Sequence, residues 1–151
     1  MDELEDLYQE IILDHGKNPR NFNISNNCMF SAVGKNPFCG DNINICVNIN
    51  KIKKIEKVTF SGTGCAISIA SASLMTEIVS GKKIEEAMRH MKNFIEMITK
   101  DDCDNKNKDS LGKLNALLGV KKFPMRVKCA TLAWHAFSTA IKNKKKQVST
   151  E

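Results

Sequence analysis

The sequence predicts an α+β fold in which several helices pack on an antiparallel sheet of three strands. Three observations lead to this prediction. The chain begins with an amphipathic helical pattern, continues with strand-like segments between residues 28 and 60, and ends in a series of helical segments. Strands and helices segregated along a chain in this way are typical of α+β domains.

Length and composition fit one ordinary domain. The chain has 151 residues, of which 42% are hydrophobic and 26% charged, as in soluble globular proteins. The acidic start lacks the basic region and apolar run of a secretory signal, and no apolar stretch approaches the roughly 18 residues that span a bilayer. We therefore expect a cytoplasmic protein without membrane contact, with a single domain over residues 1–141 and a basic, disordered tail over 142–151.

The first element is predicted from apolar residues spaced three and four positions apart, the pattern of an amphipathic helix. These residues are Leu4, Leu7, Tyr8, Ile11 and Ile12. Gly16 and Pro19 follow them and are expected to end the helix.

Three strands are expected near residues 28–34, 41–49 and 54–60. The middle strand alternates clearly, and one of its faces is apolar. That face carries Ile43, Ile45, Val47 and Ile49. Extended backwards, it includes Asp41 and Cys39, whereas Cys46 lies on the opposite face. The turn at residues 50–51 fits a hairpin into the third strand.

The hydrophobic period becomes helical after residue 60. Cys65 begins a helix rich in small residues, which ends at Ser80. Further helices are expected over 84–98 and 111–118, with a polar surface loop over 101–109 between them. Pro124 marks the first turn of the last helix, where proline is tolerated. The core stripe of that helix consists of Val127, Ala130, Trp134, Phe137 and Ile141.

The net charge of +6 is unevenly distributed. Lysines cluster at positions 51, 53, 54 and 57 and again at 142, 144, 145 and 146. Such runs are most often solvated surface, and a nucleic-acid partner is disfavoured because one Trp and one Tyr offer little material for base stacking. An acidic protein partner is the better use of this charge.

Six cysteines raise the question of disulfides. In a reducing cytosol, metal binding or reactive thiols are the better expectation than three disulfides. We interpret Cys28, Cys46 and Cys103 as structural or incidental, with Cys46 packed against neighbouring residues.

The remaining cysteines form the candidate site. Cys39 and Asp41 are two apart at the start of a strand, so their side chains share a face. Cys65 begins a helix, where the dipole favours a thiolate, and Cys129 lies near the start of the last helix. Three thiols and a carboxylate form a ligand set that zinc accepts. Arg126 lies three positions before Cys129, on the same helix face, and its guanidinium is expected to reach an anionic site.

Alternatives remain at this stage. Any one of these cysteines, taken alone, is more often a core residue than a ligand, because free Cys is among the most buried residue types. His15, His90 and His135 are weaker candidates for metal binding or acid–base work, since none stands beside the Cys-x-Asp pair. Spacing by itself does not establish a site.

Four blocks of the chain resemble the SufU/IscU (NifU N-terminal-like) family of iron–sulfur assembly proteins. They are Leu7–Ile12 with Asp14–His15 and Asn18–Arg20, then Asn36–Asp41, Phe60–Ser68 and Phe123–Trp134. Two details favour the SufU branch over the IscU scaffold branch. Lys128 stands where scaffolds usually have His, and the interval between Cys65 and Cys129 is longer than in scaffolds.

The resemblance implies an α+β sandwich and zinc bound by Cys39, Asp41, Cys65 and Cys129. It also implies that Cys39 accepts sulfur from a SufS-type cysteine desulfurase, whose pyridoxal phosphate belongs to that partner. Our own hypothesis adds Arg126 as a stabiliser of the Cys39 thiolate or persulfide. The sulfur would then either pass to a downstream iron–sulfur scaffold or stay on this chain for cluster assembly. Two other functions compete with this one: a scaffold that itself assembles a transient iron–sulfur cluster, and a non-catalytic zinc-stabilised interaction module.

Overall fold

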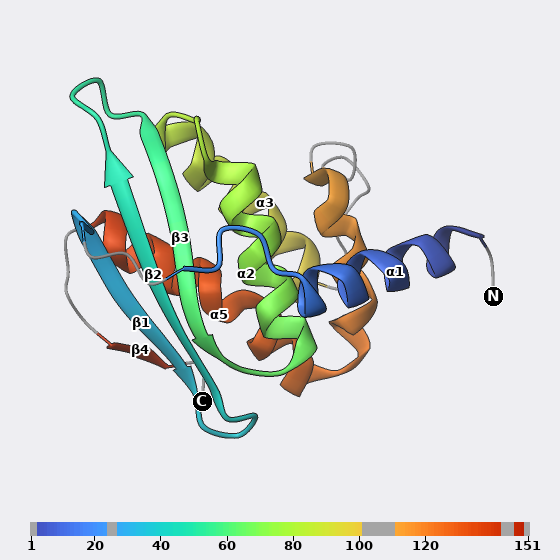
Figure 1. The fold of residues 1–151 in the computed structure, drawn as a ribbon. Helices are drawn as coiled ribbons and strands as arrows, with labels where there is room; N and C mark the ends of the chain where they lie inside the picture. The colour runs from blue at the N-terminus through green and yellow to red at the C-terminus, as the bar shows by residue number, and fades with distance from the viewer. Residues whose placement is uncertain (1–2, 24–26, 101–110, 143–146, 150–151) are drawn as a thin grey trace.

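A twisted sheet forms one layer of the molecule and a group of helices forms the other (Figure 1). The computed structural model describes residues 3–23, 27–100, 111–142 and 147–149. In chain order, the elements are α1 (Glu3–Lys17), β1 (Phe30–Asn36), β2 (Asp41–Ile49), β3 (Ile55–Thr63), α2 (Ala66–Val79), α3 (Ile84–Thr99), the 3₁₀ helix η2 (Gly112–Lys122), α5 (Pro124–Ile141) and β4 (Gln147–Ser149). The polar loop expected over 101–109, with Cys103, lies outside the described residues.

The three predicted strands pair as an antiparallel sheet, so the predicted fold class is confirmed. β1 pairs with β2 and β2 with β3, and the register aligns Asn36 with Asp41 at one end of the sheet. A short fourth strand, β4, runs parallel to the outer edge of β1 (Figure 1). The sequence analysis expected only a charged tail there, because three residues are too few to give a strand pattern.

The core lies between the inner face of the sheet and the helices. Alternation along β2 buries Ile43, Ile45 and Val47, as predicted. α5 packs across β1 and β2, and α2 packs against β3. Trp134 is fully buried in α5 and lies against Phe94 of α3 with the ring centroids 5.5 Å apart. This packing fixes the start of α5 beside the β1–β2 turn.

α1 packs against α2 and is anchored by a buried histidine. The Nδ1 atom of His15 lies 2.7 Å from the Ser73 hydroxyl, and the Ser73 oxygen also accepts the Arg20 N–H. Burial lowers the pKa of His15. Leu7, which was expected on the core face of this helix, is 50% exposed. Within the described part of the chain, no helix combines the length and apolarity needed to cross a bilayer.

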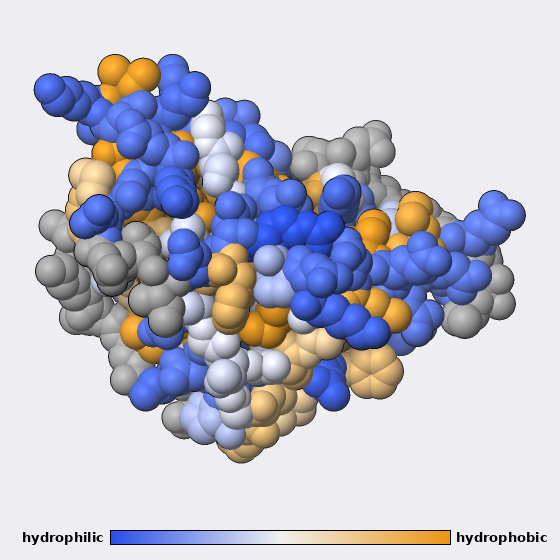
Figure 2. Space-filling view, in the orientation of Figure 1, coloured by the Kyte–Doolittle hydropathy of each residue, from blue (hydrophilic) through white to orange (hydrophobic). Residues whose placement is uncertain are grey.

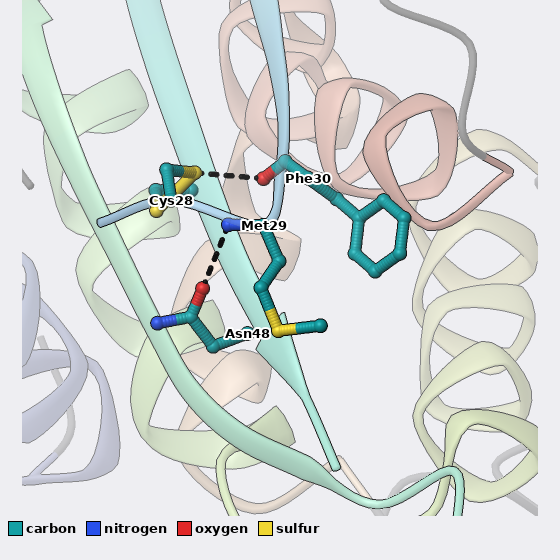
Figure 3. The surroundings of a disulfide bond; sticks show 5 residues. Cys28, Met29, Phe30 and Asn48 are labelled. Carbon is teal, nitrogen blue, oxygen red and sulfur yellow. Dashed lines mark hydrogen bonds between the residues drawn. A yellow bond between two sulfur atoms is a disulfide. The ribbon is translucent and has the colours of Figure 1, made fainter. Parts of the chain in front are cut away.

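The outer face of the sheet carries a disulfide between Cys28 and Cys46, drawn in Figure 3. The side chain of Cys46 lies on the outer face, as its position in β2 predicted. For this pair, the expectation of metal binding or reactive thiols in place of disulfides was wrong. Residues 28 and 29 cross towards β2 just before β1 begins, where the Met29 N–H donates to the Asn48 side chain (Figure 3). This crossing brings the Cα atoms of the two cysteines to 5.6 Å, within the usual range for a disulfide.

Candidate metal centre

Three connections meet at one end of the sheet: the β1–β2 turn, the β3–α2 connection and the start of α5 (Figure 1). The first supplies Cys39 and leads into Asp41, the second ends at Cys65, and the third supplies Cys129. Residues that are far apart in the chain therefore converge at this edge.

Three of the four predicted ligands form a tight cluster. The thiols of Cys39 and Cys129 and a carboxylate oxygen of Asp41 all lie within 4.8 Å of one another. Cys129 is fully buried and Asp41 is 3% exposed, whereas Cys39 is only half-buried. The cluster thus has a closed inner side and one thiol near the surface.

Cys65 adjoins this cluster without belonging to the same group of mutually close ligand atoms. Its backbone N–H donates to Asp41 Oδ1 at 2.9 Å, and its thiol lies 3.6 Å from the Ser68 hydroxyl. The Cys65 thiol also interacts with that of Cys129. All four predicted residues are therefore neighbours, and Cys65 lies at the rim of the group.

Two glycines make this arrangement sterically possible. Gly40 has a φ of 71°, a left-handed conformation that most side chains avoid, and it lets the chain turn between Cys39 and Asp41. Gly64 leaves room for the carboxylate, because a Cβ there would lie 2.7 Å from Asp41 Oδ1 and 2.5 Å from Ser68 Oγ.

Asn36 and Ser68 are two supporting residues that the sequence analysis missed. The Ser68 hydroxyl donates to Asp41 Oδ1 at 2.9 Å. The buried amide of Asn36 donates to Asp41 Oδ2 at 3.4 Å and to the Cys129 thiol at 3.6 Å, while its Oδ1 has no partner among the described residues. The signal that could have identified Asn36 is its pairing with Asp41 across β1 and β2, because residues paired at the end of a hairpin are neighbours.

Residues 7–130 match the family model described as the NifU-like N-terminal domain. The chain belongs to this family. The zinc-dependent sulfurtransferase SufU of Bacillus subtilis is 41% identical over 138 residues, covering 91% of each chain. The iron–sulfur cluster assembly scaffold protein IscU of Streptococcus pyogenes is 40% identical over 142 residues, covering 94% of this chain and 87% of the relative.

A solved structure gives the same family. It is described as a scaffold protein for iron–sulfur cluster assembly in the SUF system of Fervidobacterium islandicum. It is 35% identical, with a TM-score of 0.80, and the match covers 91% of this chain and 98% of the other. The resemblance to the SufU/IscU family is thereby confirmed.

The donor set of this NifU-like domain fits a divalent metal ion. A tetrahedral zinc ion with Zn–S bonds of about 2.3 Å needs donor atoms about 3.5 to 4 Å apart, close to the spacing of the cluster. Burial, and then hydrogen bonds with Asp41, Cys39 and Cys65, raise the pKa of Cys129. A coordinated cation reverses this preference, because a coordinating thiol loses its proton. Thiolate and carboxylate donors with supporting N–H and O–H groups are what such an ion requires.

The basic residues beside the centre lie at the surface. Arg126 is exposed in the first turn of α5, and within the described residues its guanidinium forms no ion pair or hydrogen bond. The Lys128 ammonium lies 5.4 Å from the centroid of the Phe38 ring, next to Cys39 in the chain. Lys128 therefore faces the outside of the β1–β2 turn. Within the described ranges, none of the three histidines joins the thiol cluster.

Proposed function

We propose that this chain is a zinc-dependent sulfur acceptor in iron–sulfur cluster assembly, and that Cys39 takes persulfide sulfur from a SufS-type, pyridoxal-phosphate-dependent cysteine desulfurase. The observation that carries this proposal is the position of Cys39. It is a half-buried thiol in a turn whose other residues, Pro37, Phe38 and Gly40, are exposed. A partner cysteine can approach this thiol, whereas Cys129 is enclosed on all sides.

The transfer is a thiol exchange that conserves electrons. The Cys39 thiolate attacks the outer sulfur of the persulfide carried by the desulfurase cysteine. A sulfur–sulfur bond forms at Cys39, the bond to the desulfurase cysteine breaks, and that cysteine leaves as a thiolate. No external oxidant or reductant is needed, because one persulfide replaces another.

The other residues of the centre have distinct roles in this proposal. Cys39, Asp41, Cys65 and Cys129 would hold the zinc ion, which when bound keeps its thiol ligands deprotonated. Asp41, Cys65 and Cys129 keep the site assembled while Cys39 reacts. The positive charges of Lys128, against Phe38 of the turn, and of Arg126, three positions before Cys129, would stabilise the anionic sulfur on Cys39.

The test is a turnover assay with a SufS-type desulfurase from the same organism. Wild-type protein should accelerate alanine release, and its mass after a single turnover should increase by one sulfur atom on Cys39. Cys39→Ala should abolish both effects, while Cys103→Ser, a matched change outside the proposed ligand set, should leave both unchanged. Full stimulation by Cys39→Ala would refute the proposal and leave a non-catalytic zinc module as the better description.

A scaffold function is the second candidate, because the same thiolates can bind an iron–sulfur cluster and a 40% identical relative is named a scaffold. Metal analysis of anaerobically purified protein separates the two. Sulfur transfer predicts about one tightly bound zinc per chain and no visible absorption after iron and sulfide are added. A stable cluster chromophore that requires Cys39 would favour the scaffold.

A further inference from the structure

A cavity of about 720 Å³ opens at the end of the sheet opposite to the metal centre. The β2–β3 hairpin, the residues around the start of β1, the first turn of α3 and the end of α5 surround it. β2 runs from Asp41 at the metal centre to Ile49 at the cavity, and a strand of this length places the two about 26 Å apart. The proposed sulfur transfer does not use this cavity.

The walls of the cavity are apolar and its rim is exposed. Its inner wall consists of partly buried residues that also pack on the core, namely Phe30, Ile49, Ile84 and Ile141. At the rim, Met29 is 54% exposed and Ile52 is 70% exposed. Figure 2 shows an apolar tip among hydrophilic side chains at the end of the β2–β3 hairpin. Exposed apolar side chains around a hollow are typical of a surface that another molecule covers.

Positive charge surrounds this apolar hollow. Lys53 of the β2–β3 hairpin and Lys83 before α3 line it, and Lys51 and Lys54 belong to the same hairpin as Lys53. Among the described residues, none of these four lysines forms an ion pair. Glu85 is the only carboxylate among the described residues of the lining. The first turn of α3 carries Glu85 and Glu86, which offset the positive end of its helix dipole, so the positive charge comes from the lysines.

The hairpin that carries these lysines is fixed in place. The side-chain oxygen of Asn50 accepts the N–H groups of Ile52 and Lys54. The Ile84 N–H at the start of α3 donates to the Lys53 carbonyl at 3.2 Å. The cavity is thus formed before any ligand arrives, which lowers the entropic cost of binding.

We propose that this cavity is a docking site for an acidic segment of a partner protein, with apolar side chains in the hollow and carboxylates against the lysines. The lysines favour an acidic ligand because the charges are complementary. The concave apolar walls fit protruding apolar side chains better than they fit a flat surface. Nucleic acid is disfavoured because, among the described residues, Phe30 is the only aromatic one in the lining. The lysine cluster of the β2–β3 hairpin would thus bind the carboxylates of this acidic segment.

The test is selection from a phage-displayed library of random short peptides on the zinc-loaded protein. Enriched peptides should be acidic and carry large apolar residues. Their dissociation constants should rise about tenfold on Lys53→Asn/Lys83→Gln, and similarly on Ile52→Ser. Asn suits the positive φ of 61° at position 53, so the first variant removes charge without backbone strain. The matched control, Lys17→Gln/Lys92→Gln, removes two exposed charges elsewhere and should bind normally.

Three results would overturn the proposal. One is enrichment of neutral or basic peptides only, or of peptides that bind all variants equally. Another is self-association in sedimentation equilibrium that Ile52→Ser abolishes, since a second copy would then cover the cavity. The third is Ile52-dependent binding to phosphatidylglycerol vesicles without any enriched acidic peptide. Equal zinc content in all variants keeps these outcomes separate from failure of the metal centre.

Discussion

The β1–β2 hairpin contributes one cysteine to each of two groups, Cys39 and Cys46, and the two groups have different surroundings. At the tip, Cys39 lies beside Asp41 and meets Cys65 and Cys129 from other elements. On the outer face, half-buried Cys46 pairs with Cys28 in a disulfide. Position within the strand decides the difference: Asp41 and Cys46 are an odd number of residues apart, so they lie on opposite faces of the sheet.

This difference separates two ways in which sulfur supports a fold. The tip cluster joins three parts of the chain through a buried polar network, and its donor set fits a cation. The outer pair joins two nearby segments through a covalent bond and needs no further partner. The two groups should therefore respond to different reagents: the tip cluster to chelators and the outer pair to reductants.

The largest effect is expected from Cys129→Ala. This change removes a fully buried donor that interacts with all three other proposed ligands. Because binding of structural zinc contributes directly to folding, the free energy of unfolding of the zinc-loaded protein should fall by about 4 kcal/mol or more. Urea unfolding followed by circular dichroism gives this value, and elemental analysis gives the zinc content.

A chelator provides the control for this measurement. With zinc removed from both proteins, Cys129→Ala should cost no more than the loss of a small buried side chain, about 1 to 2 kcal/mol. A difference between the variant and the wild type that is the same with and without zinc would show that Cys129 is a packing residue. The two cysteine groups would then not differ in the way proposed.

Cys28→Ser is expected to have the next largest effect. The disulfide closes a loop with a sequence separation of 18, so in oxidised protein its loss should lower the free energy of unfolding by about 3 kcal/mol. Cys46→Ser should give the same loss. In the presence of dithiothreitol, both variants should match the wild type, and zinc content should stay at the wild-type level throughout. Loss of zinc in either variant would show that the two groups are coupled.

The sequence predicted the parts of the fold that depend on periodicity, and its residue blocks named four site residues that the structure brings together as neighbours. β2 lies at the predicted residues, and Cys46 faces outward as expected. The Cys28–Cys46 pair was missed because strand periodicity gives the face of a residue but not the path of the segment before the strand. Asn36 was missed because its role depends on both the hairpin register and the approach of α5. Both features depend on tertiary contacts, which a local sequence pattern does not contain.

Gly64→Ala tests the tip without changing any donor atom. The added Cβ would lie too close to both Asp41 Oδ1 and Ser68 Oγ, so the carboxylate has to move. Zinc affinity, measured by competition with a chromogenic chelator, should fall ten- to a hundredfold, or about 2 kcal/mol. Gly119→Ala is the matched control, because a Cβ there meets nothing within 4 Å. Unchanged affinity in Gly64→Ala would mean that Asp41 is not a ligand.

The smallest effect is expected from Asn36→Ala, which removes the two N–H donations to Asp41 and Cys129. Donors beside metal ligands favour the charged forms of those ligands, so zinc affinity should fall about tenfold while the donor set stays complete. Asn36 also ends β1 and is fully buried, so its replacement should destabilise the zinc-free protein as well. The effect on zinc binding and the effect on folding can be separated by measuring zinc affinity and the stability of the zinc-free protein on the same variant. A loss of stability with unchanged affinity would make Asn36 a hairpin residue only, and support of the tip cluster would then rest with Ser68 and the Cys65 backbone.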